Sequence, residues 1–506
     1  FDLTGYRSLA AAVQDLGDGR GGTAHADHLG GSRIVPAYLA QHGGHSAIEQ
    51  VYPLHMSPVE WRVRFFKPLE QTEYNVYIDG GTGGVSGLSF ELPDSVALPS
   101  LDQDAALALA RGFLAGLGRE LGGFEVADRR TEEHENRSDH TFQFQTKAEI
   151  PAGAGDARLV YNVTIHGDHV GGYNADVKIP EEWLREYRKD TVMESVSVVA
   201  AIVLFVGLIA VWIVTVIKVM RAARPKWRAV LLGAASITLL SIVGMLNRWP
   251  TFYLNYETSV PLGSFMSSKL LVSYFVGTTA LFALYVLVAL SAGMMNPNAF
   301  RAFRAANRRL LGRDALLSAG VTLGAVMLAT GMDRLVWMTI PSAQEWPRFA
   351  APDVGVWSPA LGLVANGCLN TMIWFLVAII AQHMYRRYLT TRRRKVTVIT
   401  AAVATGFLLA MGESKSAGDL IADLVGGWFG IALILFLWRF FWRENPLALL
   451  AGIFVLSVAE DAYLLWLGGS AHRTDVWISL LFLALPLVFL AFESRGTLRK
   501  TATGRI

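Results

Sequence analysis

The chain of 506 residues is 52% hydrophobic and only 17% charged, which excludes an ordinary soluble globular protein and predicts a polytopic membrane protein. Its net charge of +3 arises from short basic clusters between apolar segments, a pattern that excludes nucleic acid as the expected partner. The single cysteine, Cys368, excludes a disulfide framework and a cysteine-based metal site within this chain.

Residues 1–190 are water-soluble in character and contain an internal repeat. The stretch YNVYIDGGTGGVSGLSFELP from Tyr74 aligns without a gap with YNVTIHGDHVGGYNADVKIP from Tyr161, an offset of 87 residues. Each stretch alternates apolar and polar residues around a Gly-rich turn, which predicts a β-hairpin. We therefore expect an α+β domain of two repeats, residues 1–95 and 96–190. The other predicted elements are helices at 32–43 and 101–121 and strands at 61–66 and 140–150.

From residue 191 to residue 495 the chain predicts an α-helical membrane bundle, followed by a short tail, 496–506. The first apolar run, 196–217, contains no charge and is long enough to cross a bilayer as a helix. Further runs make about nine predicted transmembrane helices. They are 227–247, 269–293, 314–332, 359–382, 396–412, 417–437, 446–466 and 475–492.

Alternate connectors between these runs are basic, which predicts the orientation of the bundle. Lysines and arginines cluster at 218–228, 301–313, 386–395 and 439–443 and in the tail, whereas the other loops are poor in them and carry carboxylates. Cytoplasmic loops are enriched in Lys and Arg. We therefore expect a cytoplasmic C-terminus and an extracytoplasmic soluble half.

Two resemblances follow from short motifs. A helix followed by strands and then by a hairpin with the sequence YNVYIDGGTGGV resembles the PepSY domain. This domain is an extracytoplasmic module associated with peptidases or their inhibition. The second repeat departs from that pattern, because His166 stands where the first has Asp79. The segments FDLTGYR, RSDHTFQF and VKIPEEWLREYRK are similar to parts of bacterial CAAX protease and bacteriocin-processing (CPBP) intramembrane metalloproteases. This second resemblance implies a protein of the bacterial inner membrane.

The CPBP resemblance also implies a Glu-Glu-x-x-x-Arg helix and histidines on later helices, which together would hold zinc and activate water. The membrane half has only His383 and His472, at opposite predicted faces of the membrane. Its one paired carboxylate within a span, Glu460 and Asp461, has Leu465 where the pattern requires Arg. The catalytic pattern of that family is therefore missing from this chain.

Ionisable side chains gather at the predicted outer ends of the last four helices, and we call them the outer acidic cluster. Carboxylates inside a span are costly unless they face a cavity or one another, so Glu460 and Asp461 are candidate catalytic residues. The alternative is that they reach water at the outer interface. The cluster comprises Glu413, Asp419, Asp423, Glu460, Asp461 and His472.

The soluble half offers weaker candidate sites. Two histidine pairs, His25 with His28 and His42 with His45, have a spacing that can bind a metal when both rings lie on one helical turn. Their Gly-rich flanks predict loops instead, which favours solvated histidines. The glycine run at 80–84 resembles a phosphate-binding loop in composition, but no helix and no Lys-Ser or Lys-Thr pair follows it, so we expect a turn.

The repeated module and the missing catalytic pattern favour a non-catalytic integral membrane protein. Its extracytoplasmic domain is expected to bind a protein or peptide partner, as a structural or accessory subunit of a membrane complex. Two alternatives remain open: a divergent CPBP-type intramembrane metalloprotease and a transporter. No cofactor is predicted, and zinc enters only under the protease alternative.

Overall fold

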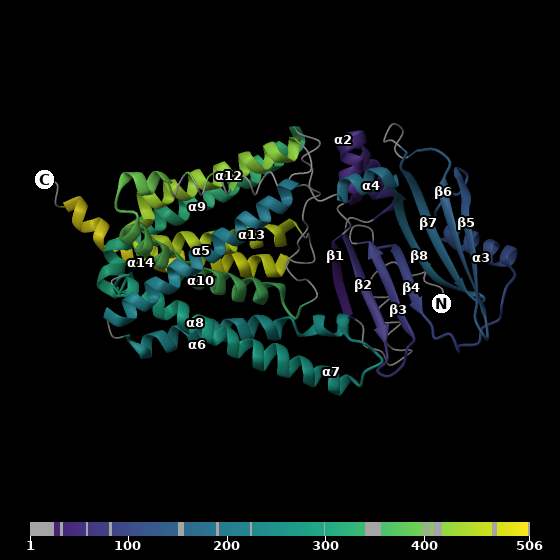
Figure 1. Ribbon diagram of the computed structural model, residues 1–506, viewed down its shortest axis with the longest axis horizontal. Coiled ribbons are helices and arrows are strands. Elements are labelled where there is room, and N and C mark those ends of the chain that lie inside the picture. The colour runs from purple at the N-terminus through teal and green to yellow at the C-terminus, as the bar shows by residue number, and fades with distance from the viewer. Residues whose placement is uncertain are drawn as a thin grey trace. The chain divides into compact units, whose positions relative to one another are not determined.

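A computed structural model of the protein divides into two compact units (Figure 1). The sheet unit comprises Phe1–Lys189, Arg248–Lys269 and Gln344–Val356, and the helical unit comprises the rest. The structure describes residues 25–30, 34–56, 59–79, 83–149, 156–188, 192–222, 225–297, 299–339, 356–397, 417–467 and 473–503, with isolated positions between 400 and 407.

One antiparallel sheet of eight strands, in the order β1-β2-β3-β4-β8-β7-β6-β5, forms the centre of the sheet unit. The order is symmetric about the contact between β4 and β8. At that contact Gly87 pairs with Asn174, and these two positions are related by the same offset of 87 residues that relates the two hairpins. The strands are β1 (His25–Gly30), β2 (Val59–Phe66), β3 (Glu73–Asp79), β4 (Val85–Glu91), β5 (Phe124–Glu133), β6 (Ser138–Thr146), β7 (Arg158–His166) and β8 (His169–Lys178).

Both predicted hairpins, β3–β4 and β7–β8, are present. In the first turn the Asp79 amide donates to the Gly84 carbonyl and Gly83 adopts a φ of +72°, which only glycine adopts easily. The glycine run at 80–84 therefore connects two strands, although residues 80–82 lie outside the described part of the chain.

A single apolar core joins the two halves of the sheet. Helix α3 (Gln103–Gly116) begins where the Asp102 carboxylate accepts a hydrogen bond from the Ala105 amide, and it packs on β6, β7 and β8. Its buried residues recur at helical spacing and meet side chains from both halves of the sheet. The core includes Ala106, Ala110 and Leu114 of α3, Val63, Val76 and Leu88 of the first half, and Phe142, Val163 and Tyr173 of the second.

Further helices belong to the sheet unit. Helix α2 (Ile34–His55) lies between β1 and β2 in the sequence and is kinked at Gly44, where φ is +66°. Its buried residues Tyr38 and Leu39 pack with Trp183 of α4 (Glu181–Arg188) in a second, smaller core. The chain returns to this unit in η1 (Trp249–Asn255) and α7 (Leu262–Lys269).

Within the described residues, seven helices are long and apolar enough to cross a membrane. They overlap seven of the nine predicted spans. Predicted span 396–412 falls largely outside the described residues, and span 446–466 corresponds to a helix whose described apolar part, Pro446–Ala459, is shorter. These seven helices are Ser195–Arg221, Trp227–Asn247, Leu262–Met295, Asn307–Met332, Pro359–Tyr388, Leu424–Trp442 and Arg473–Ser494.

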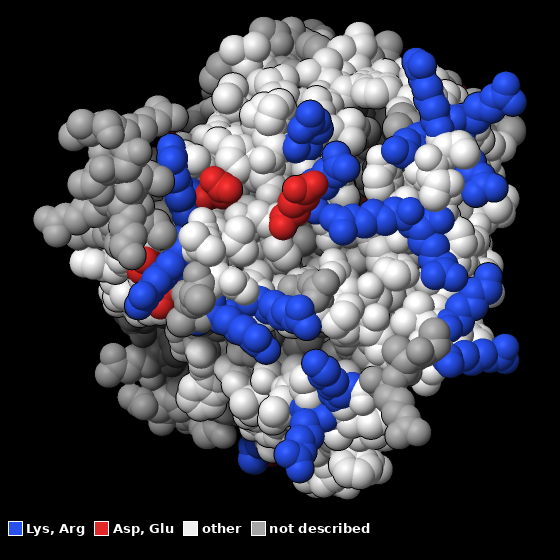
Figure 2. Space-filling model, turned by 90° about the vertical axis from the view of Figure 1, so that its left-hand side faces the viewer, with Lys and Arg blue, Asp and Glu red and all other residues white. Residues whose placement is uncertain are grey.

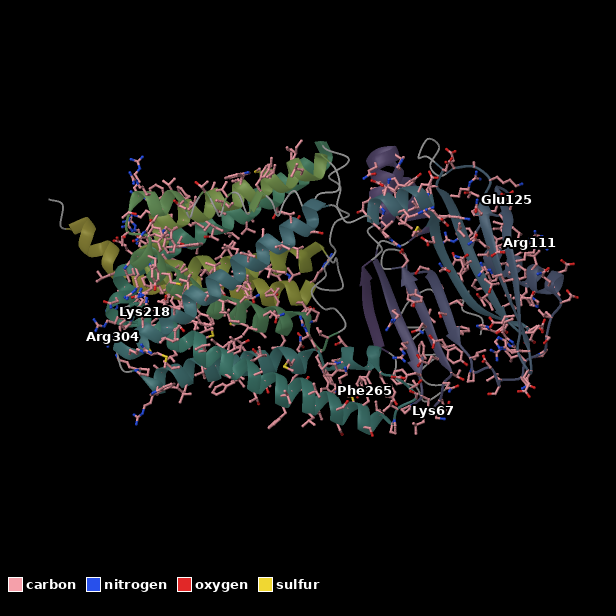
Figure 3. All side chains as sticks on the ribbon, in the orientation of Figure 1. Lys67, Arg111, Glu125, Lys218, Phe265 and Arg304 are labelled. Carbon is pink, nitrogen blue, oxygen red and sulfur yellow. The ribbon has the colours of Figure 1, made fainter. Side chains whose placement is uncertain are left out.

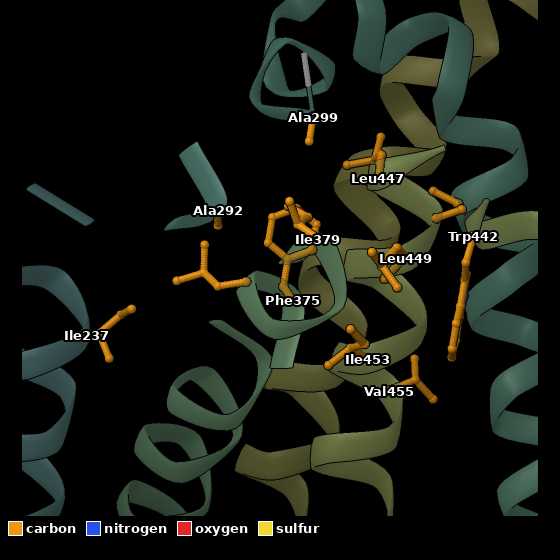
Figure 4. Close-up of a cluster of buried hydrophobic side chains, with 14 of the residues drawn as sticks. Ile237, Ala292, Ala299, Phe375, Ile379, Trp442, Leu447, Leu449, Ile453 and Val455 are labelled. Carbon is orange, nitrogen blue, oxygen red and sulfur yellow. The ribbon is translucent and has the colours of Figure 1, made fainter. Parts of the chain in front are cut away.

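The helical unit packs around one apolar core, part of which Figure 4 shows. A Cβ at Gly367 would lie 2.7 Å from Val458 Cγ2, so the absence of a side chain lets α10 approach α13 closely. Trp442 lies against Gly452 and donates its indole N–H to Ser318 Oγ at 2.9 Å. The elements are α5 (Val192–Ala222), α6 (Trp227–Asn247), η2 (Leu270–Val276), α8 (Gly277–Met295), η3 (Ala299–Phe303), α9 (Ala305–Thr339), α10 (Pro359–Tyr388), α12 (Ala417–Leu437), η5 (Trp438–Trp442), α13 (Pro446–Leu467) and α14 (Arg473–Thr503).

Candidate functional site

Two rows of polar residues cross the face of the sheet opposite α3, and we call them the polar face. Successive side chains of a strand point to opposite faces, so the neighbours of core residues such as Phe142 and Val163 belong to this face. Cross-strand pairing fixes both rows. One row contains Gln143, Asn162, Asn174, Gly87, Tyr77 and Arg62, and the other contains Thr141, Thr164, Gly172, Ser89, Asn75 and Arg64.

Glycines occupy the centre of the polar face, where β4 meets β8. A Cβ at Gly87 would lie 3.3 Å from Cδ2 of Tyr77, and a Cβ at Gly172 would lie 3.1 Å from the Cβ of Thr164. The side chains of Tyr77 on β3 and Thr164 on β7 thus contact the space above the two glycines. The centre of the face offers a ligand main-chain groups, the Tyr77 ring, the Asn174 amide and hydroxyls. Neither row has a charged residue between β3 and β6.

Side-chain amides occupy the β6, β7 and β8 positions of the first row. Gln143 Nε2 donates to Asn162 Oδ1 at 3.1 Å, both side chains are half-buried, and Asn174 is exposed. An Asn or Gln side chain presents a donor and an acceptor side by side, as a peptide bond does. The polar face can therefore hydrogen-bond to the main chain of an extended polypeptide without regard to its side chains.

A buried ionic cluster, the Asp139 cluster, lies where β6 begins. Asp139 Oδ2 lies 2.8 Å from His166 Nδ1, 3.1 Å from His134 Nε2 and 3.0 Å from Arg137 Nε. The Gly167 amide donates to the other carboxylate oxygen at 3.1 Å. Burial raises the pKa of Asp139, but the hydrogen bonds and charges of His166 and Arg137 outweigh it, so the pKa lies below its ordinary value of 3.8.

Arg137 of this cluster holds the connection between the two halves of the sheet unit. Its side chain is only 2% exposed. Nη1 donates to the carbonyl of Pro93 at 2.6 Å and to that of Val96 at 3.1 Å, both in the segment between β4 and α3. The Asp139 cluster therefore serves fold stability, since its polar atoms are occupied by main-chain groups and by one another.

Gly171→Ala is expected to disturb the Asp139 cluster. A Cβ added at Gly171 would fall 1.8 Å from Cδ2 of His166, so the imidazole would have to leave Asp139, at a cost of about 1–3 kcal/mol. The thermal unfolding midpoint of the purified chain measures this effect. Gly122→Ala is the matched control, because nothing lies within 4 Å of a Cβ there. Equal midpoints for the two variants would contradict the role of Gly171.

A second buried ion pair attaches segment 248–269 to the sheet. Arg64 donates from Nε and Nη2 to the two carboxylate oxygens of Glu73, at 2.8 and 2.7 Å. Glu73 also accepts from Thr258 Oγ1 at 3.0 Å, and Arg64 Nη1 donates to the Tyr253 carbonyl at 3.1 Å. The ring of Tyr256 packs on that of Phe66 with centroids 5.2 Å apart. This segment therefore covers the β2 end of the polar face.

The structure leaves the outer acidic cluster untested. Glu460 and Asp461 lie in α13, and Asp419 and Asp423 lie in α12, but their side chains are outside the described part of the structure, as are Glu413 and His472 entirely. Their convergence stays a prediction.

The histidine pairs of the soluble half lie in regular structure, so the prediction of loops there was wrong. His25 and His28 belong to β1, which forms by pairing with β2 far along the chain, and His42 and His45 belong to α2. His42 Nδ1 lies 2.9 Å from the Tyr38 carbonyl, and its ring stacks on that of Tyr38. Among the described side chains, no group of three or more His, Cys, Asp or Glu could hold a metal ion.

Sequence reasoning missed the polar face and the Asp139 cluster. The signal for the first was the alternation itself, because the polar positions of 74–90 and 161–177 carry amides and hydroxyls. The signal for the second was His166, which departs from the repeat pattern. Its partner Asp139 could not be chosen without the register of β6 on β7. Compared with models of protein families, with curated proteins and with solved structures, the chain matches none.

Proposed function

We propose that this chain is a non-catalytic integral membrane protein whose sheet unit binds a protein or peptide partner, as an accessory subunit of a membrane complex. The observation that carries the proposal is the polar face, whose row of side-chain amides on β6, β7 and β8 complements the main chain of an extended polypeptide. The β5 edge of the sheet is less suited to this role. β5 carries charged residues of both signs, which discourage the addition of another strand.

The proposal includes two PepSY-like repeats, about nine transmembrane helices and a location in the bacterial inner membrane. The symmetric strand order supports the repeats. The orientation, with the sheet unit outside and the C-terminus in the cytoplasm, draws support from the basic end of the helical unit: Lys218 of α5 and Arg304, just after η3, lie at this end (Figure 3).

Replacement of Asn162 and Asn174 together by Leu tests the proposed binding. Each lost hydrogen bond is worth about 0.5–1.5 kcal/mol, so we expect binding to weaken about tenfold. The measurement is the affinity of the purified full chain for a pool of unstructured decapeptides. The control is Gln71→Leu, which removes an exposed amide outside the polar face.

Two outcomes would contradict the proposal. Equal affinity in the double variant and the control would remove the polar face as the binding surface. Cleavage of the peptides by the chain alone, stopped by a chelator and by Glu460→Gln, would favour the metalloprotease alternative instead.

A further inference from the structure

One end of the helical unit is strongly basic. Figure 2 shows Lys and Arg across this end with few Asp and Glu between them on its described part. The basic residues come from several helices that are distant in the sequence. Lys218 and Arg304 lie at this end (Figure 3), and the connectors predicted on the same side of the membrane also carry Arg221, Arg228, Arg301, Arg313, Arg386, Arg387, Arg392, Arg393, Arg394, Lys395, Arg439 and Arg443.

Within this end, α10 and η5 meet at a junction that holds four cationic residues. Arg386 Nη2 donates to the Arg443 carbonyl at 2.9 Å, and Gln382 of α10 donates to the same oxygen. The rings of Tyr385 and Trp438 lie edge to face with centroids 6.4 Å apart. These contacts join the C-terminal part of α10 to η5 and to Arg443, which follows it.

Two further cations flank this contact and lie over aromatic rings. Lys395 Nζ lies 5.3 Å from the ring centroid of Tyr385, and Arg439 Cζ lies 5.5 Å from that of Phe440. Arg439 is exposed and Lys395 is half-buried. The carboxylate of Glu444 lies 3.9 Å from Arg443 Nε, but both side chains are more than half exposed, so the pair neutralises little of the positive potential.

Large apolar side chains adjoin these cations. Phe440 is 64% exposed and Phe436, one helical turn earlier, is 45% exposed. η5 is a π-helix, a geometry that is frequent at functional sites. A ligand that satisfies this surface must therefore combine a phosphate-like anion with an apolar chain. A free anion would leave Phe436 and Phe440 uncovered, and a nucleic acid would not suit a surface next to spanning helices.

We infer that the α10–η5 junction binds the headgroup of an anionic phospholipid, with its phosphate between Lys395, Arg439 and Arg386 and its acyl chains along Phe436 and Phe440. Basic pockets between membrane helices, bordered by interfacial aromatic rings, are the usual sites of such headgroups. The inference concerns a different part of the chain from the proposed partner binding and is independent of it.

Replacement of both Lys395 and Arg439 by Gln tests this inference. The full chain is reconstituted in nanodiscs of phosphatidylglycerol and phosphatidylcholine, extracted, and assayed by mass spectrometry for phosphatidylglycerol retained per protein. We expect retention to fall about tenfold, because each basic residue at a membrane surface contributes separately to the attraction. The single variant Arg439→Lys, which keeps the charge, should retain most of the lipid.

The matched control is Arg301→Gln with Arg304→Gln, which removes the same charge from another part of the basic end. Retention should fall less than about twofold there if the junction is a specific site. An equal loss in both double variants would overturn the inference in favour of diffuse attraction. Displacement of the lipid by inorganic phosphate alone would also overturn it, because the apolar part would then contribute nothing. Unchanged thermal unfolding midpoints would show that both variants are folded.

Discussion

Glu73→Gln is expected to destabilise the attachment of segment 248–269 to the sheet by about 3–5 kcal/mol. Arg64 and Glu73 are 8% and 10% exposed, so the amide would leave a buried guanidinium without its counter-charge. Glu73 also accepts from Thr258, and that hydrogen bond would weaken at the same time. The effect should be local, since the apolar core around α3 does not involve this pair.

Hydrogen–deuterium exchange of the full chain in detergent measures this loss. The Leu69 amide donates to the Thr258 carbonyl at 2.9 Å, so peptides containing Leu69 and peptides from 248–261 should exchange about 100-fold faster or more. The control is Glu70→Gln, which removes an exposed ion pair with Lys67 and should cost less than about 1 kcal/mol. If both variants exchange alike, the ion pair does not hold the segment.

The sequence was sufficient to predict elements whose signals are local. The hairpins β3–β4 and β7–β8 follow from alternation around glycine turns, and the first span follows from an uncharged apolar run. Strands β1 and β5 gave no such signal, because HADHLG and FEVADRRTEE are polar and become strands only through pairing with β2 and β6. The single sheet likewise depends on the β4–β8 contact, which joins residues 87 positions apart at Gly87 and Asn174.

Candidate sites were harder to predict, because they depend on register and on distant contacts. In the sequence, Arg64 and Glu73 are polar residues of alternating strands, and nothing marks them as buried. The structure shows that Thr258, 185 residues from Glu73, donates a hydrogen bond to Glu73. The polar face similarly required the pairing of six strands. For the outer acidic cluster the pattern predicts only that Glu460 and Asp461 share a helix, which α13 confirms.

Two buried ionic sites stabilise different parts of the sheet unit. The Asp139 cluster fixes the connection from β4 to α3, and the Arg64–Glu73 pair fixes segment 248–269. Both place a guanidinium that is at most 8% exposed against a carboxylate and main-chain carbonyls. A buried charge that loses its partner costs far more than an exposed one. We therefore expect carboxylate-to-amide changes to have large effects at these sites and small effects elsewhere on the sheet unit.

Asp139→Asn is expected to cost the sheet unit about 3–5 kcal/mol at neutral pH, because it leaves Arg137 buried without a counter-charge. The wild type should lose the same contribution progressively at low pH, by at most about 1.4 kcal/mol for each pH unit below 3.8. The pKa of Asp139 is lower in the folded state than its ordinary value of 3.8, so its contribution is complete above the unfolded-state pKa and is lost as the pH falls through the folded-state pKa.

The measurement is the thermal unfolding midpoint of the full chain between pH 7 and pH 3, with unfolding monitored by near-ultraviolet circular dichroism. The wild-type midpoint should begin to fall below about pH 4, whereas that of Asp139→Asn should start lower and lack this part of the fall. Asp94→Asn is the control, because Asp94 is 84% exposed although its carboxylate lies 3.3 Å from His134 Nδ1 of the same cluster. Its midpoint should follow that of the wild type at every pH, because an exposed ion pair contributes less than about 1 kcal/mol to the free energy of unfolding. If Asp139→Asn instead kept the wild-type drop, other carboxylates would account for the acid sensitivity, and the charge of Asp139 would not stabilise the connection from β4 to α3.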